Sequence, residues 1–142
     1  LVGGFERDLD PLAEDVEKMI EENREIVAWG FQRDVRLFFA ASDVLVFPSY
    51  REGFPNVVLQ AGAMELPSIV TDINGCNEII RNGVNGKIIP PRDVDTLYDA
   101  MKWMYEHRME VKEMAKRARP MIVERYEQQM VWSALLEEYR SL

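Results

Sequence analysis

The sequence predicts an α/β fold in which a parallel sheet carries helices on both faces. Short runs of uninterrupted apolar residues alternate with stretches that have the period of an amphipathic helix. Strands that are apolar throughout, without polar residues in alternation, are typical of strands covered on both sides. The 142 residues contain no repeat and no low-complexity linker. Residues 1–142 are therefore expected to form a single domain with one hydrophobic core.

The first quarter of the chain contributes two expected strands and two expected helices. Residues 1–4 have the pattern of a strand that stops at glycines. Asp10 followed by Pro11 is typical of a helix start. The apolar residues that follow have the spacing of one buried helix face; they are Leu12, Val16, Met19 and Ile20. A second strand is expected over residues 26–29, ended by Gly30, and a short apolar helix over residues 35–41.

The rest of the chain continues the alternation and ends in helices. The expected elements are strands at 44–47, 68–70 and 87–89, and helices at 56–64 and 77–81. Two Asn-Gly steps precede the last strand and predict a turn there. Residues 94–142 are expected to be helical: one apolar stripe comprises Val94, Leu97, Met101 and Met104, and a last helix carries Tyr126, Met130 and Leu136.

Composition excludes several classes of function. The net charge of −8 argues against nucleic acid or an anionic membrane as the main partner. No run of about 18 apolar residues is present, so no membrane-spanning helix is expected. Cys76 is the sole cysteine, which favours a reducing compartment such as the cytoplasm, and it has no basic partner nearby in sequence, so an inert thiol is expected. His107 is the sole histidine, too few for a histidine-based metal site, and is expected to be a solvated helix residue.

The stretch from residue 48 to residue 61 is the strongest candidate for a binding site. In parallel α/β sheets ligands bind beyond the carboxyl ends of the strands, here after Gly3, Gly30, Phe47 and Val70. A helix that starts near Asn56 presents free N–H groups, which favour an anion such as a diphosphate. Gly53 allows close approach to a ligand, and Glu52 could accept hydrogen bonds from sugar hydroxyls. The residues alone support almost equally an ordinary strand–turn–helix connection with a surface Glu52 and a capping Asn56.

The string EGFPNVVLQA resembles the Glu-x7-Glu region of glycosyltransferase family 4, also called group 1, and related retaining enzymes of the GT-B fold. The flanking strings ASDVLVFPSY, PSIVTDINGCNEII and NGVNGKIIPPRD are similar to the family in the same order. The resemblance implies a Rossmann-like, donor-nucleotide-binding C-terminal domain that lacks its first strand and helix. The helical end at 94–142 belongs to the same domain in this interpretation.

The resemblance also implies roles for individual residues. Glu52 would contact hydroxyls of the donor sugar as the catalytic-site carboxylate, and the backbone of the next four residues (Gly53, Phe54, Pro55 and Asn56) would lie along the sugar and diphosphate. Gln60 stands at the second acidic position, where it would bind the ribose without the charge-assisted part of the hydrogen bond. Gly30 and Phe31 would border the nucleobase, and Tyr50 would flank the nucleotide. Burial at a helix start for Phe31, and a covering role for Tyr50, are the alternatives. Asp72 and residues 74–76 are expected at the rim of the pocket.

The function implied is retaining, metal-independent transfer of a sugar from a nucleoside-diphosphate sugar, UDP-sugar rather than GDP-sugar, to a glycan or lipid-linked acceptor. Bacterial polysaccharide biosynthesis is the expected setting, with the full-length enzyme cytoplasmic or peripheral at the inner face of the membrane, and no cofactor is expected. The chain would be a piece of a two-domain enzyme, inactive alone, with the acceptor bound by a missing N-terminal domain. A strand edge left unpaired invites self-association. The alternatives are a non-catalytic nucleotide-sugar-binding or scaffold module and a nucleotide-sugar epimerase; a dinucleotide-dependent oxidoreductase would need a Gly-x-Gly-x-x-Gly helix start, which is not found.

Overall fold

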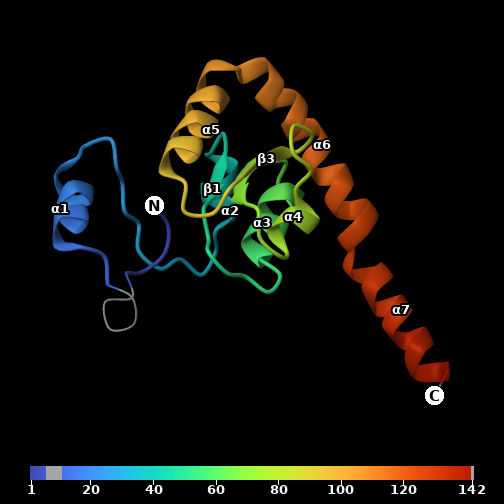
Figure 1. Cartoon of the computed structure of the whole chain (residues 1–142). Coiled ribbons are helices and arrows are strands. Elements are labelled where there is room, and N and C mark those ends of the chain that lie inside the picture. Colours follow the sequence, from blue (N-terminus) through green and yellow to red (C-terminus); the bar gives the residue numbers. More distant parts are fainter. Residues whose placement is uncertain (6–10, 142) are drawn as a thin grey trace. The chain divides into compact units, whose positions relative to one another are not determined.

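The computed structural model describes residues 1–5 and 11–141. The chain comprises two compact units, Leu1–Leu37 and Phe38–Leu142 (Figure 1). Asp10 of the predicted helix start lies outside the described residues.

The first unit is built from two hydrogen-bonded extended segments and helix α1 (Glu14–Glu22). The N-terminal amine of Leu1 donates to the Val27 carbonyl at 2.6 Å, and the Trp29 amide donates to the Leu1 carbonyl at 2.9 Å. The Gly3 amide donates to the Gly30 carbonyl at 2.9 Å. Residues 1–3 therefore run parallel to residues 27–30. The two segments predicted as strands pair with each other, but neither has the regular structure of a strand.

Helix α1 begins at Glu14, later than the Asp-Pro step predicts. Its N-cap residue, Ala13, makes no side-chain cap, and three acidic residues in the first turn interact favourably with the helix dipole. None of its residues is buried, and the side chain of Met19 is 60% exposed. The predicted buried face is therefore wrong. Periodicity identifies an amphipathic helix, but burial also needs an element to pack against it, which periodicity does not supply.

The second unit contains a parallel sheet of three strands in the order β1-β2-β3. The strands are β1 (Leu45–Phe47), β2 (Ser68–Thr71) and β3 (Gly86–Ile89). Val46 pairs with Ile69, and Val70 pairs with Ile88. The predicted strands and their parallel arrangement are confirmed. β1 and β3 are the edges of this described sheet, and self-association through an edge stays a prediction.

Helices cover both faces of the sheet, as predicted (Figure 1). On one face Val70 packs with α3 (Asn56–Ala63), α4 (Cys76–Ile79) and the later part of α6 (Arg108–Tyr126). On the other face Ile69 and Ile89 pack with α5 (Val94–Glu106) and the early part of α6. The side-chain alternation of the strands separates these two clusters. The short helix α2 (Arg36–Ala40) lies at the boundary of the two units along the chain.

Residues 94–141 form three helices, α5, α6 and α7 (Gln128–Ser141), interrupted at His107 and Glu127, which confirms the predicted helical end. The buried residues of α5 are Ala100 and Met104, whereas Val94 and Met101 are exposed, so the predicted stripe is partly wrong. Ala100 packs against the sheet, where its small side chain lets the helix approach closely. A stripe defined by large apolar residues leaves this alanine out. The predicted last helix is two helices, because α6 ends at Tyr126 and α7 runs from Gln128 to Ser141 with no buried residue.

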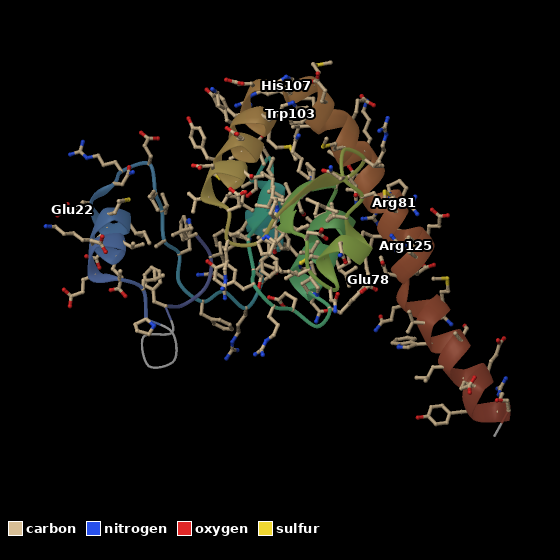
Figure 2. The ribbon with its side chains drawn as sticks, viewed as in Figure 1. Glu22, Glu78, Arg81, Trp103, His107 and Arg125 are labelled. Atoms are coloured by element: carbon tan, nitrogen blue, oxygen red, sulfur yellow. The ribbon has the colours of Figure 1, made fainter. Side chains whose placement is uncertain are left out.

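His107 lies at the junction of α5 and α6 rather than free in solvent. Its ring stacks on Trp103 with 4.5 Å between ring centroids, and its Nδ1 lies 2.9 Å from the Trp103 carbonyl (Figure 2). The ring is half-buried, so the prediction of a solvated residue is corrected. Among the described helices, none is long and apolar enough to cross a membrane.

Candidate functional site

The connection between β1 and α3 forms the strand–loop–helix unit that the sequence predicts. β1 ends at Phe47 and α3 begins at Asn56, with Pro55 at the N-cap position in extended conformation. No side chain caps this helix start, so Asn56 does not have the capping role of the alternative interpretation. A helix start without a side-chain cap presents amide donors and the positive end of its dipole to an incoming anion.

Glu52 is half-buried, and its carboxylate is held by Ser49. The Ser49 hydroxyl donates to Glu52 Oε1 at 2.7 Å. The Ser49 carbonyl in turn accepts a hydrogen bond from the hydroxyl of Thr71, the last residue of β2. The carboxylate is therefore positioned by the carboxyl ends of two neighbouring strands, although Glu52 and Thr71 lie far apart in sequence.

The turn after β2 packs directly on the loop that carries Glu52. Gly75 has φ 78°, and a β-carbon built on it would lie 2.4 Å from the Gly53 carbonyl oxygen and 2.9 Å from Pro55 Cδ. The Gly75 amide donates to Glu78 Oε1 at 3.2 Å, which closes the first turn of α4. Asp72, expected at the rim, accepts a hydrogen bond from Asn77 Nδ2 at 2.9 Å.

Cys76 is completely buried beneath this turn. Burial, and to a lesser extent the negative charge of Glu52, together raise the pKa of its thiol from 9.0 to about 11. The thiol is therefore protonated at neutral pH, in line with the expected inert role.

The other predicted residues of the loop differ in what they offer to a ligand. The Phe54 ring packs edge-on against Tyr126 with 5.4 Å between centroids, so its side chain is engaged by α6 and its backbone is left to line the site. The Tyr126 hydroxyl donates to the Glu78 carbonyl at 3.0 Å, and Figure 2 labels Glu78 and Arg125 at this junction. Pro55 is buried, whereas Asn56 and Gln60 are exposed on α3.

Tyr50 borders a small cleft of about 110 Å³ at the carboxyl ends of the strands. Its walls include Pro48 after β1, Thr71 at the end of β2 and Pro90 after β3. The guanidinium of Arg92 lies 5.2 Å from the Tyr50 ring centroid, a cation–π distance. Arg92 has φ 60°, a left-handed conformation that is unusual for a residue with a side chain. Sequence reasoning missed Arg92, and only its place after the Pro-Pro step pointed to a turn.

Gly30 and Phe31 belong to the first unit. Gly30 has φ 63° and accepts the Gly3 amide, and Phe31 is 77% exposed. Burial of Phe31 at a helix start is therefore wrong, while its place beside a nucleobase stays a prediction. Among the described residues, no three of histidine, cysteine, aspartate and glutamate gather in a way that could hold a metal ion.

The chain matches a family of known proteins and is similar to several of its curated members. A family profile described as "Glycosyl transferases group 1" matches residues 1–107. The UDP-Gal:alpha-D-GlcNAc-diphosphoundecaprenol alpha-1,3-galactosyltransferase of Escherichia coli is 33% identical over 100 residues, which cover 70% of this chain and 26% of that protein. The capsular polysaccharide biosynthesis glycosyltransferase CapM of Staphylococcus aureus is 25% identical over 122 residues, 86% of this chain and 32% of that protein.

A solved structure shares the fold. HepE of Anabaena in complex with UDP-glucose aligns with a TM-score of 0.87 and 24% identity, over 100% of this chain and 40% of that one. The chain spans 26% and 32% of the length of the two curated relatives. The similarity to HepE concerns the fold, in which the predicted parallel sheet with helices on both faces recurs.

Proposed function

This chain belongs to the group 1 glycosyl transferases, and from that premise we propose that residues 1–142 are the donor-nucleotide-binding domain of a longer, two-domain enzyme. In this proposal the loop between β1 and α3 carries the nucleotide-sugar site, and a separate N-terminal domain binds the acceptor. The small share of each curated relative that the chain covers supports a longer enzyme.

The proposed reaction moves a sugar from a UDP-sugar to a glycan or lipid-linked acceptor in bacterial polysaccharide assembly. Support for the donor comes from the Escherichia coli relative, whose name specifies UDP-Gal, and from HepE, whose structure contains UDP-glucose. Support for the acceptor comes from the diphosphoundecaprenol in that relative's name and the capsular polysaccharide in the name of CapM. A cytoplasmic enzyme, peripheral at the inner face of the membrane, fits such an acceptor.

The observation that carries the proposal is the placement of Glu52. The carboxylate is held by Ser49 in the loop that leads into α3, whose start has no side-chain cap. Here Glu52 accepts hydrogen bonds from hydroxyls of the donor sugar, and the amides at Asn56 receive the diphosphate. Charge that develops on the leaving nucleotide is stabilised by these amides and the helix dipole. Retention of configuration and independence from metal rest on the resemblance of the EGFPNVVLQA string alone.

The test uses the full-length protein that contains this chain and a panel of UDP-, GDP- and ADP-sugars. We expect transfer from one UDP-sugar, and Glu52→Gln should lower kcat/KM by about 100-fold, because an amide loses the charge-assisted hydrogen bonds. Glu65→Gln, which removes an exposed carboxylate after α3, is the matched control and should leave the rate unchanged.

Each alternative predicts a different outcome in the same assay. Donor binding without transfer to any acceptor would favour the scaffold module, for which the replacement of the second Glu by Gln60 is the supporting observation. Conversion of the donor sugar to its epimer would favour an epimerase. If the protein neither binds nor transfers any sugar of the panel, the proposal is contradicted.

A further inference from the structure

We infer that Ser49 is a positioning residue for Glu52, and that Thr71 fixes Ser49 in turn. The pair would hold the carboxylate in the orientation in which it meets the donor sugar. This inference rests on the proposed function, because it assumes that Glu52 contacts the donor.

The first link is the short contact between the Ser49 hydroxyl and Glu52 Oε1. A serine hydroxyl has one hydrogen to donate, and two acceptors lie within reach. Glu52 Oε1 is 2.7 Å away, whereas the Arg51 carbonyl is 3.4 Å away. A contact of 2.7 Å to a carboxylate has the length of a charge-assisted hydrogen bond, so the hydrogen belongs to Glu52.

The second link ties Ser49 to the sheet. Thr71 is 1% exposed, so its hydroxyl has no access to bulk water and depends on a partner within the protein. That partner is the Ser49 carbonyl. Because Thr71 also pairs with Ile89 across β2 and β3, the backbone of Ser49 is anchored to a regular element of the fold.

The hydrogen bond from Ser49 engages one of the two carboxylate oxygens of Glu52. Only Oε1 of Glu52 is engaged by Ser49, so Oε2 stays available to accept a hydrogen bond from a sugar hydroxyl. A glutamate in a loop without this anchor would sample several rotamers, and each binding event would then have to order it. Ser49 therefore contributes to donor binding through Glu52, without touching the donor.

The test measures the donor dissociation constant of the full-length protein in a double-mutant cycle. Ser49→Ala should weaken binding of the preferred UDP-sugar by about tenfold. In the Glu52→Ala background the same substitution should change the dissociation constant less than about twofold, because the group that it positions is gone. Ser42→Ala is the matched control, since its hydroxyl makes a similar 2.6 Å hydrogen bond to the Phe38 carbonyl.

A second pair of variants tests the link to the sheet. Thr71→Val keeps the side-chain volume but removes the hydroxyl, and it should weaken donor binding as Ser49→Ala does. The double variant should bind the donor no more weakly than Ser49→Ala alone. Thr71→Ser keeps the hydroxyl and should retain wild-type affinity. The KM for the acceptor should be unchanged in all of these variants.

The outcomes separate this inference from the proposed function. If Glu52→Ala itself leaves donor binding intact, both fail. If Glu52→Ala weakens binding but Ser49→Ala does not, the inference alone is overturned. An undiminished Ser49→Ala effect in the Glu52→Ala background would also overturn it, because Ser49 would then act independently of the carboxylate.

Discussion

Gly75 lies so close to the carbonyl oxygen of Gly53 that no side chain fits between them. A β-carbon on Gly75 would lie 2.4 Å from that oxygen and 3.1 Å from Phe54 Cα, well inside van der Waals contact. The neighbouring atoms are backbone and cannot rotate away. The turn after β2 thus sets the position of the loop that carries Glu52.

Gly75→Ala should therefore displace the Glu52 loop. We expect a lower Tm and a loss of donor affinity of about tenfold or more, measured by thermal unfolding and by titration with the UDP-sugar. Gly83→Ala is a matched control, because Gly83 has φ 77° but no heavy atom within 4 Å of the added β-carbon. It shares the backbone strain, about 1 kcal/mol, and should leave donor affinity intact. Equal effects of the two substitutions on affinity would contradict this account.

Gln60→Glu should strengthen donor binding. Gln60 is exposed on α3, one turn beyond Asn56, and a carboxylate there would accept charge-assisted hydrogen bonds from the ribose hydroxyls. The expected gain is about fivefold in the dissociation constant, the equivalent of about 1 kcal/mol. Gln128→Glu adds the same charge at the start of α7 and should have no effect. An unchanged affinity in Gln60→Glu would show that this position does not meet the ribose.

Glu65→Gly should stabilise the fold. Glu65 has φ 61° just after α3, where the Leu66 amide donates to the Ala61 carbonyl at 2.9 Å in the pattern of a glycine-type C-cap. Glycine adopts this conformation without strain, so the free energy of unfolding should rise by about 1 kcal/mol in urea titrations. Glu65→Ala removes the carboxylate but keeps the strain. If Ala and Gly gave the same gain, the effect would come from the charge.

Cys76 should react slowly in the folded protein, and its titration should lower stability at high pH. The folded pKa of about 11 lies above the ordinary value of 9.0, so the unfolded chain loses its thiol proton first. The contribution to stability is therefore complete below pH 9 and is lost as pH rises toward 11. Plotted against pH, the free energies of unfolding of the wild type and of Cys76→Ala should converge or cross between pH 9 and pH 11. Two plots that stay parallel over this range would refute the raised pKa. Alkylation at pH 8 should require unfolding.

Much of the second unit was predictable because its strands are apolar on both faces. The apolar runs that form β1, β2 and β3 predict strands covered by helices on both faces. The position of Glu52 beyond the carboxyl end of β1 follows from the order of the elements along the chain. The resemblance of EGFPNVVLQA to the Glu-x7-Glu region then predicted a role for the loop that carries Glu52.

The remaining features depend on contacts that have no local signal. The Thr71 hydroxyl reaches Ser49 across the sheet, and nothing near either residue in sequence indicates it. The backbone of Arg92 is left-handed although neither glycine nor asparagine stands there. The helix break at Glu127 is likewise unmarked, because the residues around it are compatible with a helix and only its extended backbone separates α6 from α7.

Helix α6 joins the two layers that cover the sheet. Val111 and Met114 pack in the cluster beneath α5, and Ile122 packs in the cluster beneath α3. Opening of α6 would admit water to both faces of the sheet together. In native-state hydrogen exchange, the amides of α3, α5 and the three strands should therefore behave as one cooperative unit. Helix α7, which buries no residue, should exchange outside that unit and earlier.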